Sequence, residues 1–98
     1  MKQHYSPISP VYYEIFASEL DKENSKVFYF DNGTDIEEAK GIIRGLVNNG
    51  LSGEYLILDS GVDVRIDRII TINGIPGPAY DEYDSYALAS LNCNVPSD

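Results

Sequence analysis

The residues of this chain that could take part in chemistry are almost all carboxylates. The sequence holds one histidine, His4, and one cysteine, Cys93. A catalytic serine or cysteine needs an imidazole held within hydrogen-bond reach, and His4 lies in a polar stretch that contains two prolines. A single cysteine forms neither an internal disulfide nor a multi-cysteine metal site. We therefore expect no catalytic residues, no metal site and no cofactor.

Two short acidic stretches look like calcium loops, namely Asp31 to Asp35 (DNGTD) and Asp59 to Asp63 (DSGVD). An EF-hand places glycine at its sixth position and a bidentate glutamate at its twelfth. Here the glycine comes early, and the twelfth positions are Ile42 and Ile70. Neither stretch therefore predicts an EF-hand.

The carboxylates fall into three groups, which are our candidate partner-binding residues. Alternate residues of a strand lie roughly 6.6 Å apart on one face, which is comparable to about two steps along one DNA strand. Acids at the first turn of a helix also have a local explanation, because they complement the helix dipole. The first group is Glu54, Asp59, Asp63 and Asp67; the second is Asp31, Asp35, Glu37 and Glu38; the third is Asp81, Glu82 and Asp84, interleaved with Tyr80 and Tyr83.

The composition describes a small acidic protein. The 98 residues include 16 acidic and 7 basic side chains, for a formal net charge of −9, and 43% of the residues are hydrophobic. Such a chain is long enough for one domain spanning 1–98. Phosphate backbones and anionic membranes would repel it, so we expect a basic protein surface as its partner and no direct binding of nucleic acid. The same charge also favours solubility.

The clearest secondary-structure pattern runs from Thr34 to Gly50 and predicts a helix. Thr34 and Glu37 have the spacing of a capping box, and the Asn-Asn-Gly ending is a typical helix stop. The apolar residues recur at helical spacing. They are Ile36, Ala39, Ile43, Leu46 and Val47.

The other segments predict four strands and a second helix. Branched and aromatic residues favour strands at 11–20, 26–30, 54–59 and 62–73, with a break in the last near Arg68 and a tight turn at Asn73-Gly74. Residues 79–91 have helical spacing, and residues 1–10 and 92–98 read as loose termini. The order is β-β-α-β-β-α. We therefore expect an α+β fold, with helix 34–50 packed on one face of a four-stranded antiparallel or mixed sheet.

Two further features complete the expectations. Tyr12, Tyr13, Tyr29 and Tyr55 fall in predicted strands, where packing is their ordinary role, whereas Tyr80 and Tyr83 are placed either for core packing or for an interface. The N-terminus lacks the apolar core of a signal peptide, and no apolar run reaches membrane-spanning length. These features predict a cytoplasmic protein.

In size, charge and predicted architecture, the chain resembles the DNA-mimic inhibitors made by phages and mobile elements, which include anti-CRISPR and antirestriction proteins. The resemblance is carried by the acidic, cysteine-poor, single-domain character of the chain and by no sequence motif. It implies that carboxylates imitate phosphates. It also implies a partner lined with Lys and Arg, in the cytoplasm of an infected or host bacterium.

The expected function is therefore that of a non-catalytic inhibitor. It would bind the basic nucleic-acid channel of a defence complex, such as a CRISPR surveillance complex or a restriction enzyme, and block DNA binding. Three alternatives come from other classes: a barstar-like immunity protein that plugs a nuclease, a structural subunit that self-associates through its tyrosines, and a small enzyme that uses converging carboxylates.

Overall fold

The protein is built mainly from short antiparallel strands. A computed structural model of the chain describes residues 5, 7–31 and 33–85. Residues 80–85 are helical. The other elements, in chain order, are α1 (Val11–Ser18), β1 (Ser25–Asp31), β2 (Asp35–Gly41), β3 (Ile43–Asn48), the 3-10 turn η1 (Gly50–Ser52), β4 (Glu54–Leu58), β5 (Asp63–Arg65), the 3-10 turn η2 (Ile66–Arg68), β6 (Ile69–Ile72) and β7 (Ile75–Pro76).

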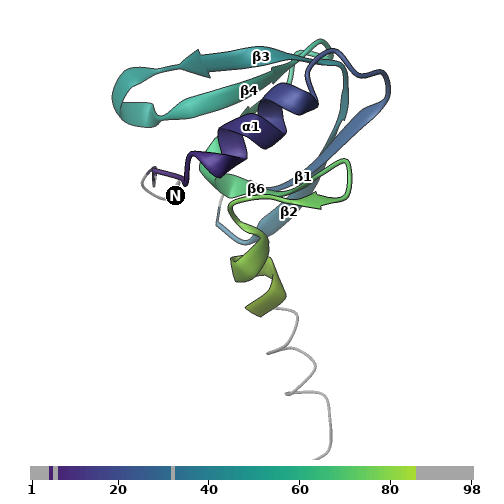
Figure 1. Cartoon of the computed structure of the whole chain (residues 1–98). Coiled ribbons are helices and arrows are strands. Elements are labelled where there is room, and N and C mark those ends of the chain that lie inside the picture. The colour runs from purple at the N-terminus through teal and green to yellow at the C-terminus, as the bar shows by residue number, and fades with distance from the viewer. Residues whose placement is uncertain (1–4, 6, 32, 86–98) are drawn as a thin grey trace, which may run out of the picture.

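The strands form two antiparallel sheets, in the orders β2-β1-β6-β7 and β3-β4-β5 (Figure 1). The chain passes between them at Gly41, which joins β2 to β3, and again through η2, which joins β5 to β6. Gly41 has a φ of +143°, and a Cβ there would lie 2.5 Å from Oδ1 of Asp59. Only glycine therefore fits this corner without displacing its neighbour.

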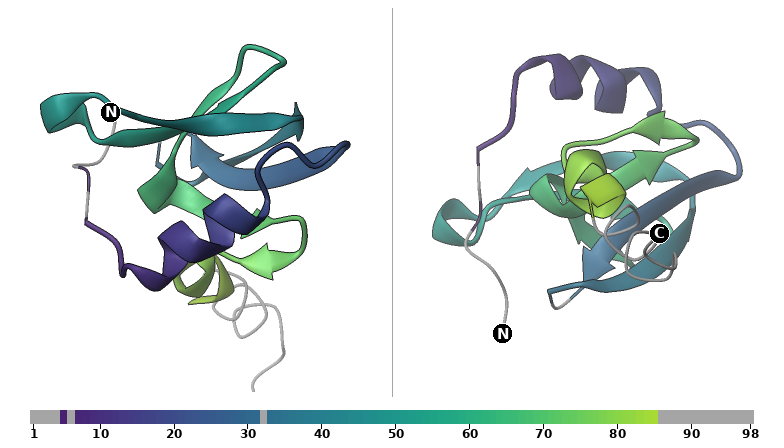
Figure 2. Two further views of the ribbon diagram at one scale, coloured as in Figure 1. Left: turned by 45° about the horizontal axis from the view of Figure 1, so that its top comes forward. Right: turned by 90° about the horizontal axis from the view of Figure 1, so that it is seen from below.

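One core lies between the two sheets, and α1 covers its side. Helix α1 lies to one side of the strands, at the top of the right-hand view in Figure 2, whereas residues 80–85 lie on a different side. The buried core residues come from α1, both sheets and η2. They are Phe16, Val27, Ala39, Ile43, Leu56, Leu58, Val64, Ile66, Ile69 and Ile72.

A second, smaller cluster covers part of the opposite face of the first sheet. Phe30 and Ile70 are buried there under Ala79, and Tyr80 packs against them. The chain can cross β6 closely because residue 77 is a glycine, whose Cβ would lie 2.6 Å from the carbonyl oxygen of Ile69. The first sheet is therefore apolar on both faces.

The predicted helix at 34–50 is wrong. These residues form β2 and β3, in different sheets, so the expected four-stranded sheet with one main helix is replaced by two antiparallel sheets. A helix would have held Gly41 and Gly45 in its interior, and each costs about 1 kcal/mol relative to alanine. As strands, the segment gains pairing with β1 and β4 and still buries Ala39 and Ile43. That tertiary gain outweighs the capping-box pattern.

The predicted strand at 11–20 is also wrong, because residues Val11–Ser18 form α1. Pro10 stands at the N-cap with a φ of −56°, and proline is already set for the start of a helix. Burial follows helical spacing, since Tyr12, Ile15 and Phe16 face the core while Val11 and Glu14 are exposed. The aromatic and branched residues of this segment therefore predicted the wrong secondary structure.

Other elements of the prediction are present in the structure. The predicted strands 26–30 and 54–59 correspond to β1 and β4. The break near Arg68 is η2, which separates β5 from β6, and Asn73-Gly74 is a hairpin turn with φ of +49° and +83°. The second predicted helix is helical from residue 80, and its residues 86–91 lie outside the described residues, as do His4 and the terminus 92–98. No helix in the described ranges is long and apolar enough to cross a membrane.

The placement of β3 gives a test of this architecture. Ile43 is fully buried, whereas Val47, on the same strand, is 47% exposed. We expect Ile43→Ala to lower the free energy of unfolding by about 2–5 kcal/mol, and Val47→Ala to change it by less than about 0.5 kcal/mol. Denaturant unfolding of both variants measures the difference. Equal losses would indicate a helix over 34–50, which would bury both side chains.

Candidate interaction surface

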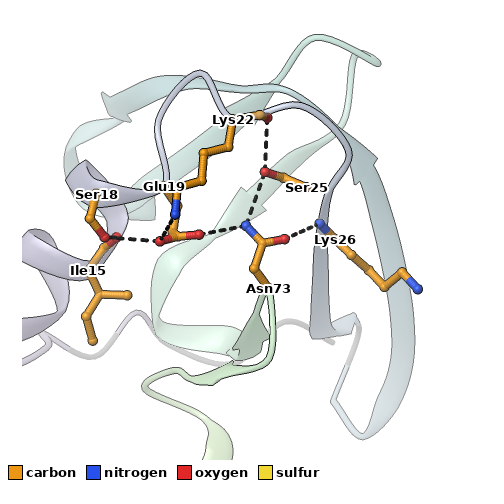
Figure 3. A network of polar contacts seen from close by, with 7 residues as sticks. All are labelled: Ile15, Ser18, Glu19, Lys22, Ser25, Lys26 and Asn73. Carbon is orange, nitrogen blue, oxygen red and sulfur yellow. Dashed lines mark hydrogen bonds and ion pairs between the residues drawn. The ribbon is translucent and has the colours of Figure 1, made fainter.

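The most buried carboxylate of the structure, Glu19, belongs to a polar network at the end of α1 (Figure 3). Its Oε1 accepts a hydrogen bond from Nδ2 of Asn73 at 2.8 Å, and its Oε2 accepts one from the Lys22 ammonium at 3.0 Å and one from the Ser18 hydroxyl at 3.1 Å. These donors, Asn73 first, lower the pKa of Glu19 against the opposing effect of burial. Glu19 is therefore a buried carboxylate kept ionised by its partners.

Asn73 extends this network to the first sheet. Its Nδ2 also donates to the Ser25 hydroxyl at 3.2 Å, and its Oδ1 accepts from the backbone N–H of Lys26 at 2.8 Å. The network thus joins the end of α1, the start of β1 and the β6–β7 turn (Figure 3). Its described groups bond to one another, which indicates a structural role.

A second polar cluster lies where the N-terminal segment meets the second sheet. The Tyr13 hydroxyl donates to the Glu54 carboxylate, and this bond, with burial, raises the pKa of Tyr13. Nε of Arg65 lies 2.6 Å from Oδ1 of Asp67, and both side chains are almost fully buried. The Arg65 guanidinium also lies 6.0 Å from the centre of the Tyr5 ring. This cluster, too, is held by internal partners.

The four carboxylates of the first acidic group therefore do not line one exposed face. Glu54 and Asp67 take part in the cluster just described, and Asp59 accepts a hydrogen bond from the backbone N–H of Ile42 at 2.8 Å. Asp63 is exposed, but Asp67, also a candidate partner-binding residue, is only 8% exposed. The reason is that residues 62–73 are not one strand: η2 turns the chain after β5 and brings Asp67 onto Arg65.

Arg68 joins the β1–β2 hairpin to the helical segment at 80–85. Its Nη1 and Nη2 lie 2.9 and 3.1 Å from the two carboxylate oxygens of Glu82, and Nη2 donates to the carbonyl oxygen of Gly33 at 3.1 Å. The guanidinium also lies 4.9 Å from the centre of the Phe30 ring. Such bidentate pairs fix geometry well. This side chain therefore brings the second and third acidic groups together.

We use the name acidic rim for two sets of carboxylates that Arg68 connects, one near the end of the hairpin and one on the helical segment 80–85. It consists of Asp31, Asp35, Glu37, Asp81, Glu82 and Asp84. Asp31 lies directly opposite Asp35 across the hairpin, and Glu37 lies opposite Tyr29. Burial, followed by the charges of Asp31 and Glu37, raises the pKa of Tyr29. Of the six, only Glu82 makes a hydrogen bond or ion pair with another described residue.

The hairpin part of the acidic rim is not explained by the stability of the fold. Like charges directly opposite each other on a hairpin are destabilising, and the pair of Asp31 and Asp35 has that arrangement. Glu38, the remaining member of the second group, differs because Lys26 and Lys40 lie 3.5 and 3.6 Å from its carboxylate. The rim is thus a concentration of charge that the described cations leave largely unbalanced.

An apolar groove lies on the outer face of the first sheet, next to the helical segment that carries part of the rim, whereas Asp31, Asp35 and Glu37 alternate onto the other face. Its volume is about 350 Å³, and it is lined by Phe28, Ile36, Ile70, Thr71 and Tyr83. Phe28, Ile36 and Tyr83 are 37%, 48% and 37% exposed. The irregular register between β1 and β6 lets Ile70 and Thr71 share this face. Exposed apolar surface rimmed by polar groups is typical of interaction sites.

This groove separates the roles of the two tyrosines that the sequence left open. Tyr80 packs against the cluster of Phe30, Ile70 and Ala79, whereas Tyr83 lines the groove. Sequence reasoning missed the groove itself. One signal was available, because the stretch Lys26 to Phe30 (KVFYF) is apolar on both faces, which predicts a strand that must be covered on both sides.

No metal site accompanies these clusters: in residues 5, 7–31 and 33–85, no group of three or more His, Cys, Asp or Glu side chains could hold a metal ion. Every side-chain nitrogen or oxygen atom that is fully buried in those ranges has a hydrogen-bond partner. The acidic rim and its groove are therefore the candidate functional site.

The network around Glu19 predicts a pH dependence of stability. The folded-state pKa of Glu19 lies below its ordinary value of 4.5. Its contribution to stability is therefore fully present above that ordinary value and is lost as the pH falls through the folded-state pKa. We expect Glu19→Gln to cost about 1–3 kcal/mol at pH 7, and the cost to shrink in acid. Glu23→Gln, at an exposed neighbouring position, should change little; an equal effect of both substitutions in urea unfolding at pH 7 and pH 3 would contradict this role.

The bridging role of Arg68 gives another test. Arg68→Lys keeps the charge but loses the bidentate geometry, so we expect faster hydrogen exchange at the amides of residues 80–85. Arg44→Lys is the matched control, because Arg44 forms an exposed pair with Asp21 and such pairs contribute little. Unchanged protection of 80–85 in Arg68→Lys would show that other contacts hold this segment.

Comparisons with known proteins found no match: no protein-family model, no curated protein and no solved structure matches the chain.

Proposed function

We propose that this protein is a non-catalytic binding protein whose acidic rim docks on the basic, nucleic-acid-binding surface of another protein and keeps nucleic acid off it. The observation that carries the proposal is the acidic rim itself. Five of its six carboxylates lack a cation partner among the described residues, and an exposed apolar groove lies next to the helical segment that carries part of the rim. Such a surface is suited to a partner that supplies the missing positive charge.

The spacing of the rim carboxylates supports mimicry of a phosphate backbone. Directly opposed residues on a hairpin lie about 5 Å apart at Cβ, and alternate residues of one strand lie about 6.6 Å apart. Asp31, Asp35 and Glu37 occupy such positions. The larger of these separations corresponds to about two steps along one DNA strand. A site that recognises phosphates by their charge would meet carboxylates at comparable separations.

The partner class within this proposal is a bacterial defence complex, such as a CRISPR surveillance complex or a restriction enzyme. Its nucleic-acid channel has the charge that the rim requires, and the small, acidic, cysteine-poor chain has the character of known inhibitors of such complexes. In this proposal the apolar groove contributes short-range contact once charge attraction has formed the encounter.

A matched pair of triple variants tests the proposal. The rim variant carries Asp35→Asn, Glu37→Gln and Asp81→Asn; the control carries Glu14→Gln, Asp21→Asn and Glu23→Gln, at exposed positions outside the candidate groups. Both change the net charge from −9 to −9 + 3 = −6. The immobilised wild-type protein and both variants are used to capture partners from bacterial lysate, and the association rate of the purified partner is then measured at low and high salt.

We expect the rim variant to associate about tenfold more slowly than the control. The difference should shrink at high salt, and added duplex DNA or RNA should displace the partner. If the two variants lose binding equally, the acids serve general solubility. A partner that nucleic acid does not displace would contradict the proposed block.

A further inference from the structure

The outer edge of β2 is an unpaired strand edge next to both the groove and the rim. In the first sheet β2 is terminal and pairs with β1 alone. Its pairing with β1 runs without a bulge from Asp35 to Gly41, and no described strand pairs with its other side. Every second residue of such an edge presents its N–H and C=O groups outward.

Edges of this length are usually protected, and β2 lacks most of the usual devices. It has seven residues and contains neither a proline nor a register shift. Its protection is charge, from Asp35, Glu37, Glu38 and Lys40. The two rim acids on β2, Asp35 and Glu37, disfavour pairing with a second acidic copy of β2. They favour pairing with a strand that carries Lys or Arg.

The two faces of β2 have different chemistry near this edge. Side chains alternate along a strand, so Ile36 lies on the outer face with Phe28 and Phe30, whereas Asp35 and Glu37 lie on the other face with Asp31 and Tyr29. Ile36 lines the groove and is 48% exposed. Near the hairpin end, an added strand would therefore meet Ile36 on one face and the carboxylates of Asp35 and Glu37 on the other.

We propose that an extended segment of a protein partner adds to β2 as a further antiparallel or parallel strand, with an alternating basic–apolar–basic pattern. Its apolar side chain enters the groove beside Ile36, and its basic side chains on either side meet Asp35 and Glu37. Main-chain hydrogen bonds supply affinity in this mode of recognition, and the side-chain pockets supply specificity. The inference rests on the proposed function, because it takes the acidic rim as the partner-binding surface.

The probe is a synthetic peptide, acetyl-Thr-Lys-Thr-Lys-Phe-Lys-Thr-Lys-Thr-amide, titrated into the full-length protein at low salt and followed by amide NMR. We expect shifts at the amides of β2 and at residues lining the groove. Replacing the peptide Phe with Ser should weaken binding by at least about tenfold, because the groove then stays empty. Replacing Lys with Glu should abolish binding.

Backbone methylation of the peptide separates strand addition from simple charge attraction. Two peptides are compared, with N-methyl groups on the odd or on the even residues. Only one set of N–H groups points at β2 in an added strand, so one peptide should lose binding and the other should keep it. Equal affinity of the two peptides, or no binding of the parent peptide, would overturn strand addition.

A matched pair of protein variants locates the site. Ile36→Ser should weaken peptide binding by about tenfold, whereas Val47→Ser, at an equally exposed position of the second sheet, should leave it unchanged. Shifts at β2 that depend on protein concentration without peptide would identify a second copy as the occupant. Broadening of β2 amides by a spin label on Cys93 would identify the chain's own C-terminal residues. Either result would overturn the proposal.

The outcomes also distinguish this inference from the function on which it rests. If the peptide fails while the rim variant still loses a partner displaced by nucleic acid, strand addition is wrong and the proposed function stands. If the methylation pattern is observed but nucleic acid displaces no captured partner, the edge of β2 binds basic segments and the proposed block of nucleic-acid binding is wrong.

Discussion

The first sheet must cover two apolar faces with a short chain, and most of the structure follows from this constraint. Its inner face carries Val27, Ile69 and Ile72, which α1 and the second sheet bury completely. Its outer face receives only the turn at Ala79 and the start of the last helical segment, which cover Phe30 and Ile70. Phe28 and Ile36 remain partly exposed. The groove is therefore the part of an apolar face that the described chain does not cover.

The polar groups of the protein divide according to whether the fold uses them. Glu19, Glu54 and Asp67 are hydrogen-bonded within the protein, and they join α1 or η2 to the sheets. A buried charge is tolerated only with such partners. Apart from Glu82, the carboxylates of the acidic rim make no comparable bonds with other described residues, and the opposition of Asp31 and Asp35 costs stability. Charge that stabilises the fold and charge that is available for binding are thus spatially separate.

Arg68 connects these two sets. Its guanidinium is largely buried, stacks over Phe30, and bonds both to Glu82 and to the backbone of the hairpin end. It consequently places Tyr83, one residue further along the chain from Glu82, at the groove beside Ile36. The same side chain neutralises only one carboxylate of the rim. Its role is therefore positional: it assembles the groove and the rim from segments that are far apart in sequence.

The sequence alone determined the features that depend on neighbouring residues: the strands at β1 and β4, the break at Arg68, the Asn73-Gly74 turn and the excess of acids. Only the tertiary structure decided that Val11–Ser18 is a helix and that Asp35–Asn48 forms two strands. Local propensities differ by about 1 kcal/mol or less for most residues, so strand pairing and burial outweigh them.

The groove joins Phe28, Ile36, Ile70, Thr71 and Tyr83, and the rim joins 31–37 to 81–84. Such contacts between distant segments leave no local pattern, because they form only when the sheets close and Arg68 reaches Gly33 and Glu82.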